Sequence, residues 1–92
     1  MNSIVELSKT AERQLHKIPA QERLGILNEL SALSSNPLPP FPKCKKLVGI
    51  KPATYRLRIG NYRAIYRIYQ NKIAILVVID RKELERETKK LV

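Results

Sequence analysis

Four arginines in the middle of the chain are the residues whose type and spacing could do chemistry. They lie in the segment Thr54–Tyr69, which reads TYRLRIGNYRAIYRIY. Glycine favours the positive φ of a type II′ turn, so we read this segment as two strands joined at Gly60–Asn61. Arg58 then faces Arg63 across the hairpin. Because side chains alternate across a strand, two separate faces result. The arginine face carries Arg56, Arg58, Arg63 and Arg67, and the other face carries Tyr55, Leu57, Ile59, Tyr62, Ala64, Tyr66 and Ile68.

The arginine face predicts a surface that binds phosphate groups. Two arginines directly opposite each other repel and weaken strand pairing, so folding gives no reason to place them there. A polyanionic ligand does, because a planar guanidinium can bind two phosphate oxygens at once. The alternative is the solvent-exposed face of an ordinary antiparallel sheet, on which arginine is common. With no Asp or Glu among the four arginines, we favour phosphate binding.

Composition bounds the size of the protein and the chemistry of its partners. Its 92 residues suffice for one domain, residues 1–92, with a single core. The whole net charge of +10 lies in residues 43–92, which hold fourteen Lys and Arg against four Asp and Glu. Nucleic acid, an acidic protein or both are therefore expected as partners. One cysteine, Cys44, excludes an internal disulfide and a cysteine-based metal cluster, and neither a metal nor a cofactor is expected.

Neither secretion nor membrane insertion is predicted. No hydrophobic segment typical of a signal peptide follows the N-terminus. The longest apolar run, Ile73–Ile79, is too short to cross a bilayer. We therefore expect a cytoplasmic protein without a membrane partner. The only histidine, His16, is expected at the surface and not in acid–base chemistry.

Hydrophobic periodicity predicts the elements that must position the arginines. A short strand at Ser3–Leu7 precedes a helix that Ser8 caps and that runs to Ile18. Pro19 opens a second helix over Ala20–Leu33, and prolines then make residues 34–42 an extended connection. The second helix is expected to pack Gly25 closely and to bury Ile26, Leu27, Leu30 and Leu33.

The last strand completes an α+β fold. Residues 73–79 are apolar at every position, which predicts a central strand covered on both faces, with the first strand as its outer neighbour. Asp80 and Glu83 form a capping-box pattern for a final helix. We predict an N-terminal strand and an α-hairpin packed on a four-stranded, mostly antiparallel sheet, with a short C-terminal helix.

The end of the sheet near Gly60 is the candidate site. Pairing the last two strands across their turn puts Ile79 beside Tyr62. Arg81 then lies at the same end of the sheet as Arg58 and Arg63. Three guanidinium groups from three segments are expected to converge there.

Two motifs resemble the core of the RelE/ParE superfamily of type II toxin–antitoxin toxins. They are KKLVG at residues 45–49 and YRLRIGNYRAIY at residues 55–66, and the resemblance extends over essentially the whole chain. It implies the RelE-like fold. The RelE branch is known for cutting messenger RNA in the ribosomal A site without a metal, whereas the ParE branch poisons DNA gyrase. The resemblance also implies an acidic, RelB-like antitoxin, with operator DNA bound only through the toxin–antitoxin complex.

Carried over by position, the resemblance assigns roles to individual residues. The catalytic set falls on Arg58, Arg63 and Arg81, with Glu85 at the position of the family's catalytic tyrosine. Glu85 is then the candidate base. Its alternative is an exposed helix residue paired with Lys89. Phosphate contacts are expected from Lys45, Lys46, Arg56, Arg67 and Lys82.

Functions from different classes stay open. The favoured one is a ribosome-dependent endoribonuclease, with the ribosome and messenger RNA as partners. The second is a ParE-like gyrase inhibitor that performs no chemistry. The basic cluster favours the first, and the missing tyrosine and histidine favour the second. A nucleic-acid-binding domain, or a degenerate toxin that only engages its antitoxin, is the third.

Overall fold

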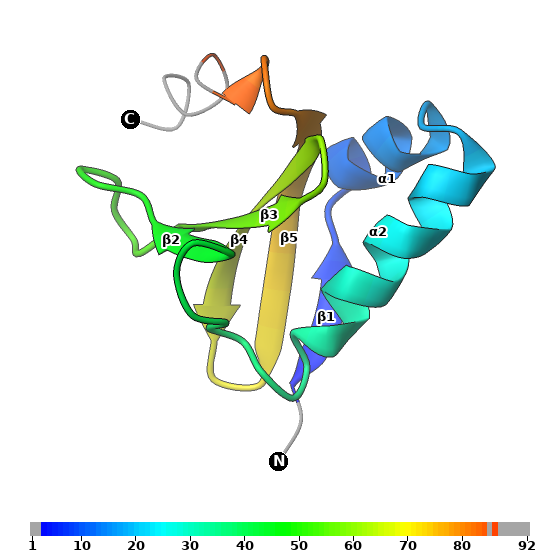
Figure 1. Cartoon of the computed structure of the whole chain (residues 1–92). Helices are drawn as coiled ribbons and strands as arrows, with labels where there is room; N and C mark the ends of the chain where they lie inside the picture. Colours follow the sequence, from blue (N-terminus) through cyan, green and yellow to red (C-terminus); the bar gives the residue numbers. More distant parts are fainter. Residues whose placement is uncertain (1–2, 85, 87–92) are drawn as a thin grey trace.

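The computed structural model describes residues 3–84 and 86, in which two helices pack on a five-stranded sheet. In chain order the elements are β1 (Ile4–Leu7), α1 (Lys9–His16), α2 (Ala20–Ala32), β2 (Cys44–Lys46), β3 (Tyr55–Ile59), β4 (Tyr62–Tyr69) and β5 (Lys72–Asp80). Both helices lie on one side of the sheet (Figure 1). The predicted α+β class and its layers are confirmed.

The strands form one mixed sheet in the order β1-β5-β4-β3-β2. β1 pairs parallel to β5, and the other neighbours pair antiparallel. The prediction that the first strand lies outside the last one is confirmed. The predicted number of four strands is wrong, because β2 pairs with β3 as a further edge strand. Its three residues, CKK, show no apolar alternation that would distinguish a strand from a loop.

Local sequence sets the helix ends. The Ser8 hydroxyl accepts a hydrogen bond from the backbone N–H of Ala11 at 2.9 Å, which confirms the predicted cap of α1. α1 ends at His16, two residues before the predicted Ile18, and α2 begins directly after Pro19. His16 is exposed, as predicted.

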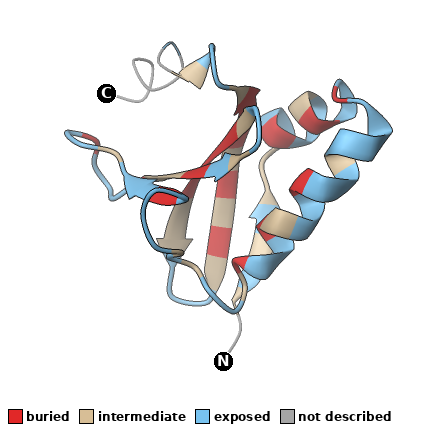
Figure 2. Cartoon of the chain, viewed as in Figure 1, coloured by how far each residue is buried: buried red, intermediate tan, exposed pale blue. Residues whose placement is uncertain are grey.

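The main core lies between the helix pair and the sheet. Figure 2 shows the buried residues on β4, β5 and the helix sides that face them. α2 contributes Ile26, Leu30 and Leu33 to this core. Leu27 does not belong to it, contrary to the prediction: it is 36% exposed, because its position on α2 lies to the side of that buried stripe. Gly25 is not closely packed either, since a Cβ there would meet no heavy atom within 4 Å.

A bulge changes the predicted pairing of β4 with β5. From the β4–β5 turn back to Tyr66, each residue of β4 faces the residue of β5 that the turn predicts. Between Tyr66 and Ile65 the register shifts by one residue. Tyr62 therefore faces Asp80, and the expectation that it lies beside Ile79 is wrong. Arg81 still lies at the predicted end of the sheet, beside the hairpin turn, because its backbone N–H donates to the carbonyl of Asn61 at 2.9 Å.

The far side of the sheet carries a second, smaller apolar cluster. Ile65, Val77 and Ile79 are buried there, while Ile75 and Val78 of the same last strand belong to the main core. Both faces of β5 are therefore covered, as its continuous apolar sequence predicts. The arginines of β3 and β4 share their face with this cluster.

The segment after β5 begins with a side-chain cap. The Asp80 carboxylate accepts a hydrogen bond from the backbone N–H of Glu83 at 3.0 Å, which is one half of the predicted capping box. Most of the predicted C-terminal helix, with Glu85 and Lys89, lies outside the described residues. Among the described helices, none is both long and apolar enough to cross a membrane.

Candidate phosphate-binding site

The β3–β4 hairpin has the predicted register. Arg58 faces Arg63 and Tyr55 faces Tyr66. Gly60 has a φ of +56°, the conformation that the turn requires of its first central residue. Tyr66 is fully buried on the helix side, so the arginines occupy the opposite face, as predicted.

Arg63 is the buried centre of the arginine face. Only 7% of its surface is exposed, although it belongs to neither hydrophobic cluster. Its Nη1 donates hydrogen bonds to the carbonyls of Gly60 and Tyr62, both at 2.8 Å. The ion pairs found among residues 3–84 and 86 join other side chains, so no described carboxylate neutralises Arg63. No described residue accepts a hydrogen bond from its Nε or Nη2, which can therefore donate to an anion.

Three further arginines act on Arg63 electrostatically. Burial, and then repulsion from Arg56, Arg58 and Arg81, lowers the pKa of the Arg63 guanidinium below its ordinary value. The group stays charged at neutral pH because that ordinary value lies above about 12. A desolvated cation with cationic neighbours costs stability, and a bound anion relieves both effects. The structure thus brings Arg58 and Arg81 close enough to repel Arg63, and their role toward phosphate stays a prediction.

Two other basic residues extend this face along β3. Arg56 donates weakly to the carbonyl of Pro42, at 3.3 Å from Nη1 and 3.4 Å from Nη2. Lys45 of β2 pairs with Arg56 and is exposed. Because paired residues of an antiparallel sheet share a face, Lys45 adds a cation to the arginine face.

The remaining predicted phosphate ligands are placed differently. The Nε of Arg67 donates to the hydroxyl of Thr54 at 3.1 Å, and this fully buried hydroxyl donates to the carbonyl of Pro52 at 2.8 Å. Arg67 therefore fixes the segment before β3. No sign of this role is visible in the sequence, because nothing in it shows that Thr54 lies beside Arg67. Lys46 pairs with Tyr55, so it lies on the helix side and not on the arginine face. Lys82 is exposed in the turn after β5.

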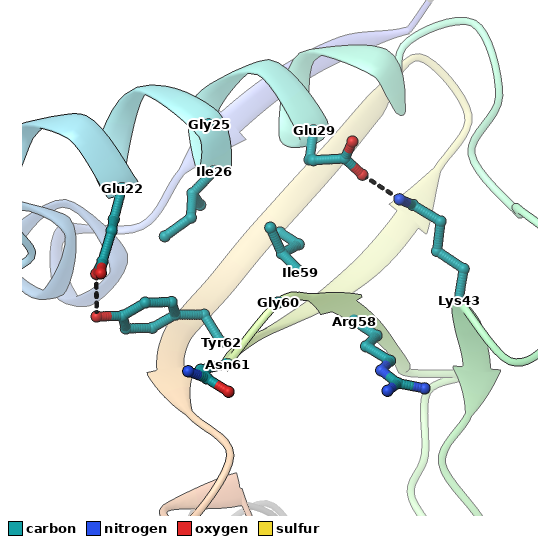
Figure 3. Close-up of a pocket in the computed structure, with 10 residues that line it drawn as sticks. All are labelled: Glu22, Gly25, Ile26, Glu29, Lys43, Arg58, Ile59, Gly60, Asn61 and Tyr62. Carbon is teal, nitrogen blue, oxygen red and sulfur yellow. Dashed lines mark hydrogen bonds and ion pairs between the residues drawn. The ribbon is translucent and has the colours of Figure 1, made fainter.

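A groove of about 400 Å³ lies on the helix side of the hairpin turn, against α2. Figure 3 shows the two polar contacts that cross it. The Tyr62 hydroxyl donates to the Glu22 carboxylate at 2.8 Å, and Lys43 pairs with Glu29. The side chain of Arg58 points away from α2 in this view. With carboxylates along α2, this groove is not the place for a phosphate.

Groups that could move a proton are scarce in the described part of the site. Tyr66 donates to the carbonyl of Pro37 at 2.7 Å and contacts the Sγ of Cys44 at 3.0 Å, far inside the main core. Burial, and the hydrogen bond with Cys44, raise the pKa of Tyr66, so its phenol stays protonated. The hydrogen bond to Glu22 raises the pKa of Tyr62 as well. The described residues can hold a phosphate, and Glu85 lies outside them.

Comparison with known proteins relates the chain as a whole to toxin–antitoxin systems. The family model described as the ParE toxin of type II toxin–antitoxin systems matches residues 5–85. A chain of the archaeal RelE–RelB complex from Pyrococcus horikoshii is 28% identical, with a TM-score of 0.76 over 88% of this chain and 97% of that one. A chain of the toxin–antitoxin complex RelBE2 from Mycobacterium tuberculosis is 31% identical, with a TM-score of 0.71 over 88% of this chain and 100% of that one. No curated protein sequence matches significantly.

Proposed function

Because this chain belongs to the ParE toxin family of type II toxin–antitoxin systems, we propose that it is a toxin that cuts messenger RNA on the ribosome. The observation that carries the proposal is Arg63, a buried guanidinium without a described acidic partner. A binding surface for a folded protein does not need a desolvated cation. A fixed cation from which water is excluded stabilises the charge of a phosphate in its transition state more strongly than an exposed one does.

Cleavage of RNA without a metal needs three activities. A base takes the proton of the 2′-hydroxyl, cations stabilise the crowded phosphorane, and an acid protonates the leaving 5′-oxygen. Arg63 supplies the second activity, because its bonds to the carbonyls of Gly60 and Tyr62 fix the guanidinium before the substrate arrives. Arg58 and Arg81 add charge around the same phosphate.

Proton transfer must come from another group. Arginine does not lose its proton in proteins, so the arginine face cannot act as the base. We assign this role to Glu85, whose position in the sequence corresponds to the family's catalytic tyrosine. The ribosome contributes by aligning the 2′-hydroxyl with the phosphate, and orientation alone can supply several kcal/mol of the barrier.

The partner that silences this toxin is an acidic antitoxin segment laid over the arginine face. Similarity to chains from RelE–RelB and RelBE2 complexes supports such a partner. The net charge of +10 favours an acidic one and predicts faster association at low salt. Operator DNA is then bound only through the toxin–antitoxin complex, in the cytoplasm.

Inhibition of DNA gyrase without any chemistry is the second candidate function. Two observations favour it: the matching family model is that of the ParE toxin, and no tyrosine follows Tyr69 in the sequence. Here the arginine face would bind gyrase or its DNA, and substitution of Glu85 would change nothing.

Mapping new 5′ ends on translated messages after brief expression of the chain decides between the two candidates. The ribonuclease proposal expects cuts within translated regions that disappear when ribosomes are stalled by an initiation inhibitor. A gyrase assay that scores double-strand cleavage runs beside it. Glu85→Gln should remove the cuts if Glu85 is the base. Unchanged cutting would mean that Glu85 is not the base and supports its alternative role as an exposed residue paired with Lys89. Growth inhibition with gyrase cleavage and without new 5′ ends contradicts the ribonuclease.

A further inference from the structure

The connection between β2 and β3 is held in one conformation beside the arginine face. This segment, Leu47–Thr54, is called the basic loop below. It is closed at its base by a hydrogen bond from the backbone N–H of Leu47 to the carbonyl of Thr54, at 2.8 Å. Arg67 reaches across from β4 to the Thr54 hydroxyl, and Gly49 makes the bend with a φ of +78°. In Figure 1 the loop stands on the side of the sheet away from the helices.

An apolar side chain is displayed at the tip of this basic loop. Val48 is 91% exposed, so burial in the folded protein gains almost nothing from it. Behind it the loop forms a pocket of about 400 Å³, which Leu47 and Ile50 line together with Lys46 and Lys51. Single exposed valines are common, but this one stands at the mouth of a pocket with two cations in its lining.

The surroundings of the basic loop carry charge of one sign. Residues 43–79 contain nine Lys and Arg and no Asp or Glu. Lys45 joins the loop to Arg56, with which it pairs, and Arg56 precedes Arg58 on the same face. Cations therefore run without interruption from Arg63 to the basic loop. A chain of phosphates could follow this path.

We propose that the basic loop binds a second nucleotide of the RNA whose phosphate lies at Arg63. The base packs on Val48 and Leu47 at the mouth of the pocket, and Lys51 contacts the neighbouring phosphate. Sites for single-stranded nucleic acid combine cations along the backbone with a flat nonpolar surface for the bases, and here Val48 and Leu47 take the place that aromatic side chains hold in many such sites. This inference rests on the proposed function and adds a subsite to it.

The spacing of the two subsites makes the proposal testable by RNA length. Thr54 directly precedes β3 and lies four residues before Arg58, which corresponds to about 14 Å of extended chain. A strand gripped at its scissile phosphate therefore reaches the basic loop only with a nucleotide further along. A dinucleotide, with its single phosphate at Arg63, is too short to reach the basic loop, whereas a strand of several nucleotides reaches both subsites.

The experiment measures binding of uncleavable 2′-O-methyl RNA by fluorescence anisotropy, with oligonucleotides of about 2 and about 10 nucleotides. Val48→Ser is expected to weaken binding of the longer RNA about fivefold and to leave the shorter one unchanged. Leu24→Ser is the matched control, because Leu24 is also exposed, at 63%, but lies on α2. Lys51→Gln should lower the salt dependence for the longer RNA by about 0.7 in slope, and Lys17→Gln, at an exposed lysine after α1, should not.

Three results would overturn the proposal. The first is that Val48→Ser binds both RNA lengths as tightly as the unchanged chain, while Arg63→Gln no longer binds the shorter RNA. The loop then has no role in RNA binding, and the phosphate site at Arg63 is retained. The second is weakened binding of an acidic antitoxin peptide with unchanged RNA affinity, which makes the loop a protein contact. The third is Arg63→Gln binding both RNAs normally, which removes the proposed function and the subsite with it.

Discussion

Arg63→Gln removes one charge from the centre of the arginine face and keeps a side chain of moderate size. Arg63 donates hydrogen bonds to two backbone carbonyls at 2.8 Å, and its other two nitrogens have no acceptor among the described residues. Loss of a fixed charged donor from a transition state costs about 2.7–4 kcal/mol, which is about 10²–10³ in rate. The two lost hydrogen bonds lower the stability by about 1 kcal/mol each. Removing a buried charge that neighbouring arginines repel raises the stability and offsets part of this loss. We therefore expect the free energy of unfolding to change by less than about 2 kcal/mol.

The assay is single-turnover cleavage of messenger RNA on programmed ribosomes, with urea denaturation of each variant beside it. Arg67→Gln is the matched control, because Arg67 lies on the same strand and face but is bound to Thr54. It should lose no more than about tenfold in rate. Arg63→Lys should fall between the two, since one ammonium cannot hold both carbonyls and grip two phosphate oxygens. A folded Arg63→Gln protein that cuts as fast as the unchanged chain, or an equal loss in Arg67→Gln, would refute the reasoning.

Three more predictions follow from individual contacts. Gly25→Ala should raise the free energy of unfolding by about 0.5–1 kcal/mol, because a glycine inside a helix costs stability and the new Cβ meets no atom within 4 Å; a lower urea midpoint would contradict this. Tyr66 has a raised pKa, so the unfolded chain releases this proton near pH 10 while the folded protein keeps it. Stability should then be retained below about pH 10 and fall above it, less steeply in Tyr66→Phe, as urea titrations across that range would show; equal slopes would exclude Tyr66 as the cause. Sulfate, compared with chloride at equal ionic strength, should raise the melting temperature of the unchanged chain more than that of Arg63→Gln; equal shifts would mean that no anion binds Arg63.

The difference between the two candidate functions lies in one residue. A ribonuclease needs a proton acceptor near Arg63. Tyr62 and Tyr66 form hydrogen bonds on the helix side of the sheet, and Tyr69 lies at the opposite end of β4 from Arg63. Glu85 is the carboxylate that the resemblance puts there. Its substitution by Gln therefore separates an enzyme from a binding protein more directly than any change on the arginine face, which both functions need.

Local rules in the sequence determined the hairpin and its two faces. Gly60 permits the turn, and the period of two in the strands then leaves one pairing that buries Tyr66 and turns the arginines away from the helices. The cap at Ser8 and the central position of β5 follow equally from neighbouring residues and from a continuous apolar run. The RelE/ParE resemblance, read from the same stretch, is confirmed by the family match.

Contacts between distant segments decided the rest. The bulge at Ile65/Tyr66 shifts the alternation of β5, so that Ile75 and Val78, three residues apart, both face the main core, and no pattern within β4 records this shift. The burial of Arg63 depends on the carbonyls of its own turn and on what covers it, and the engagement of Arg67 depends on where Thr54 lies thirteen residues earlier. Residue types and alternation state which side of a strand a charge occupies. The packing of the folded chain decides how far that charge is desolvated and which of its N–H donors can still bind a phosphate. Both depend on the atoms that surround the side chain, which come from segments distant in the sequence.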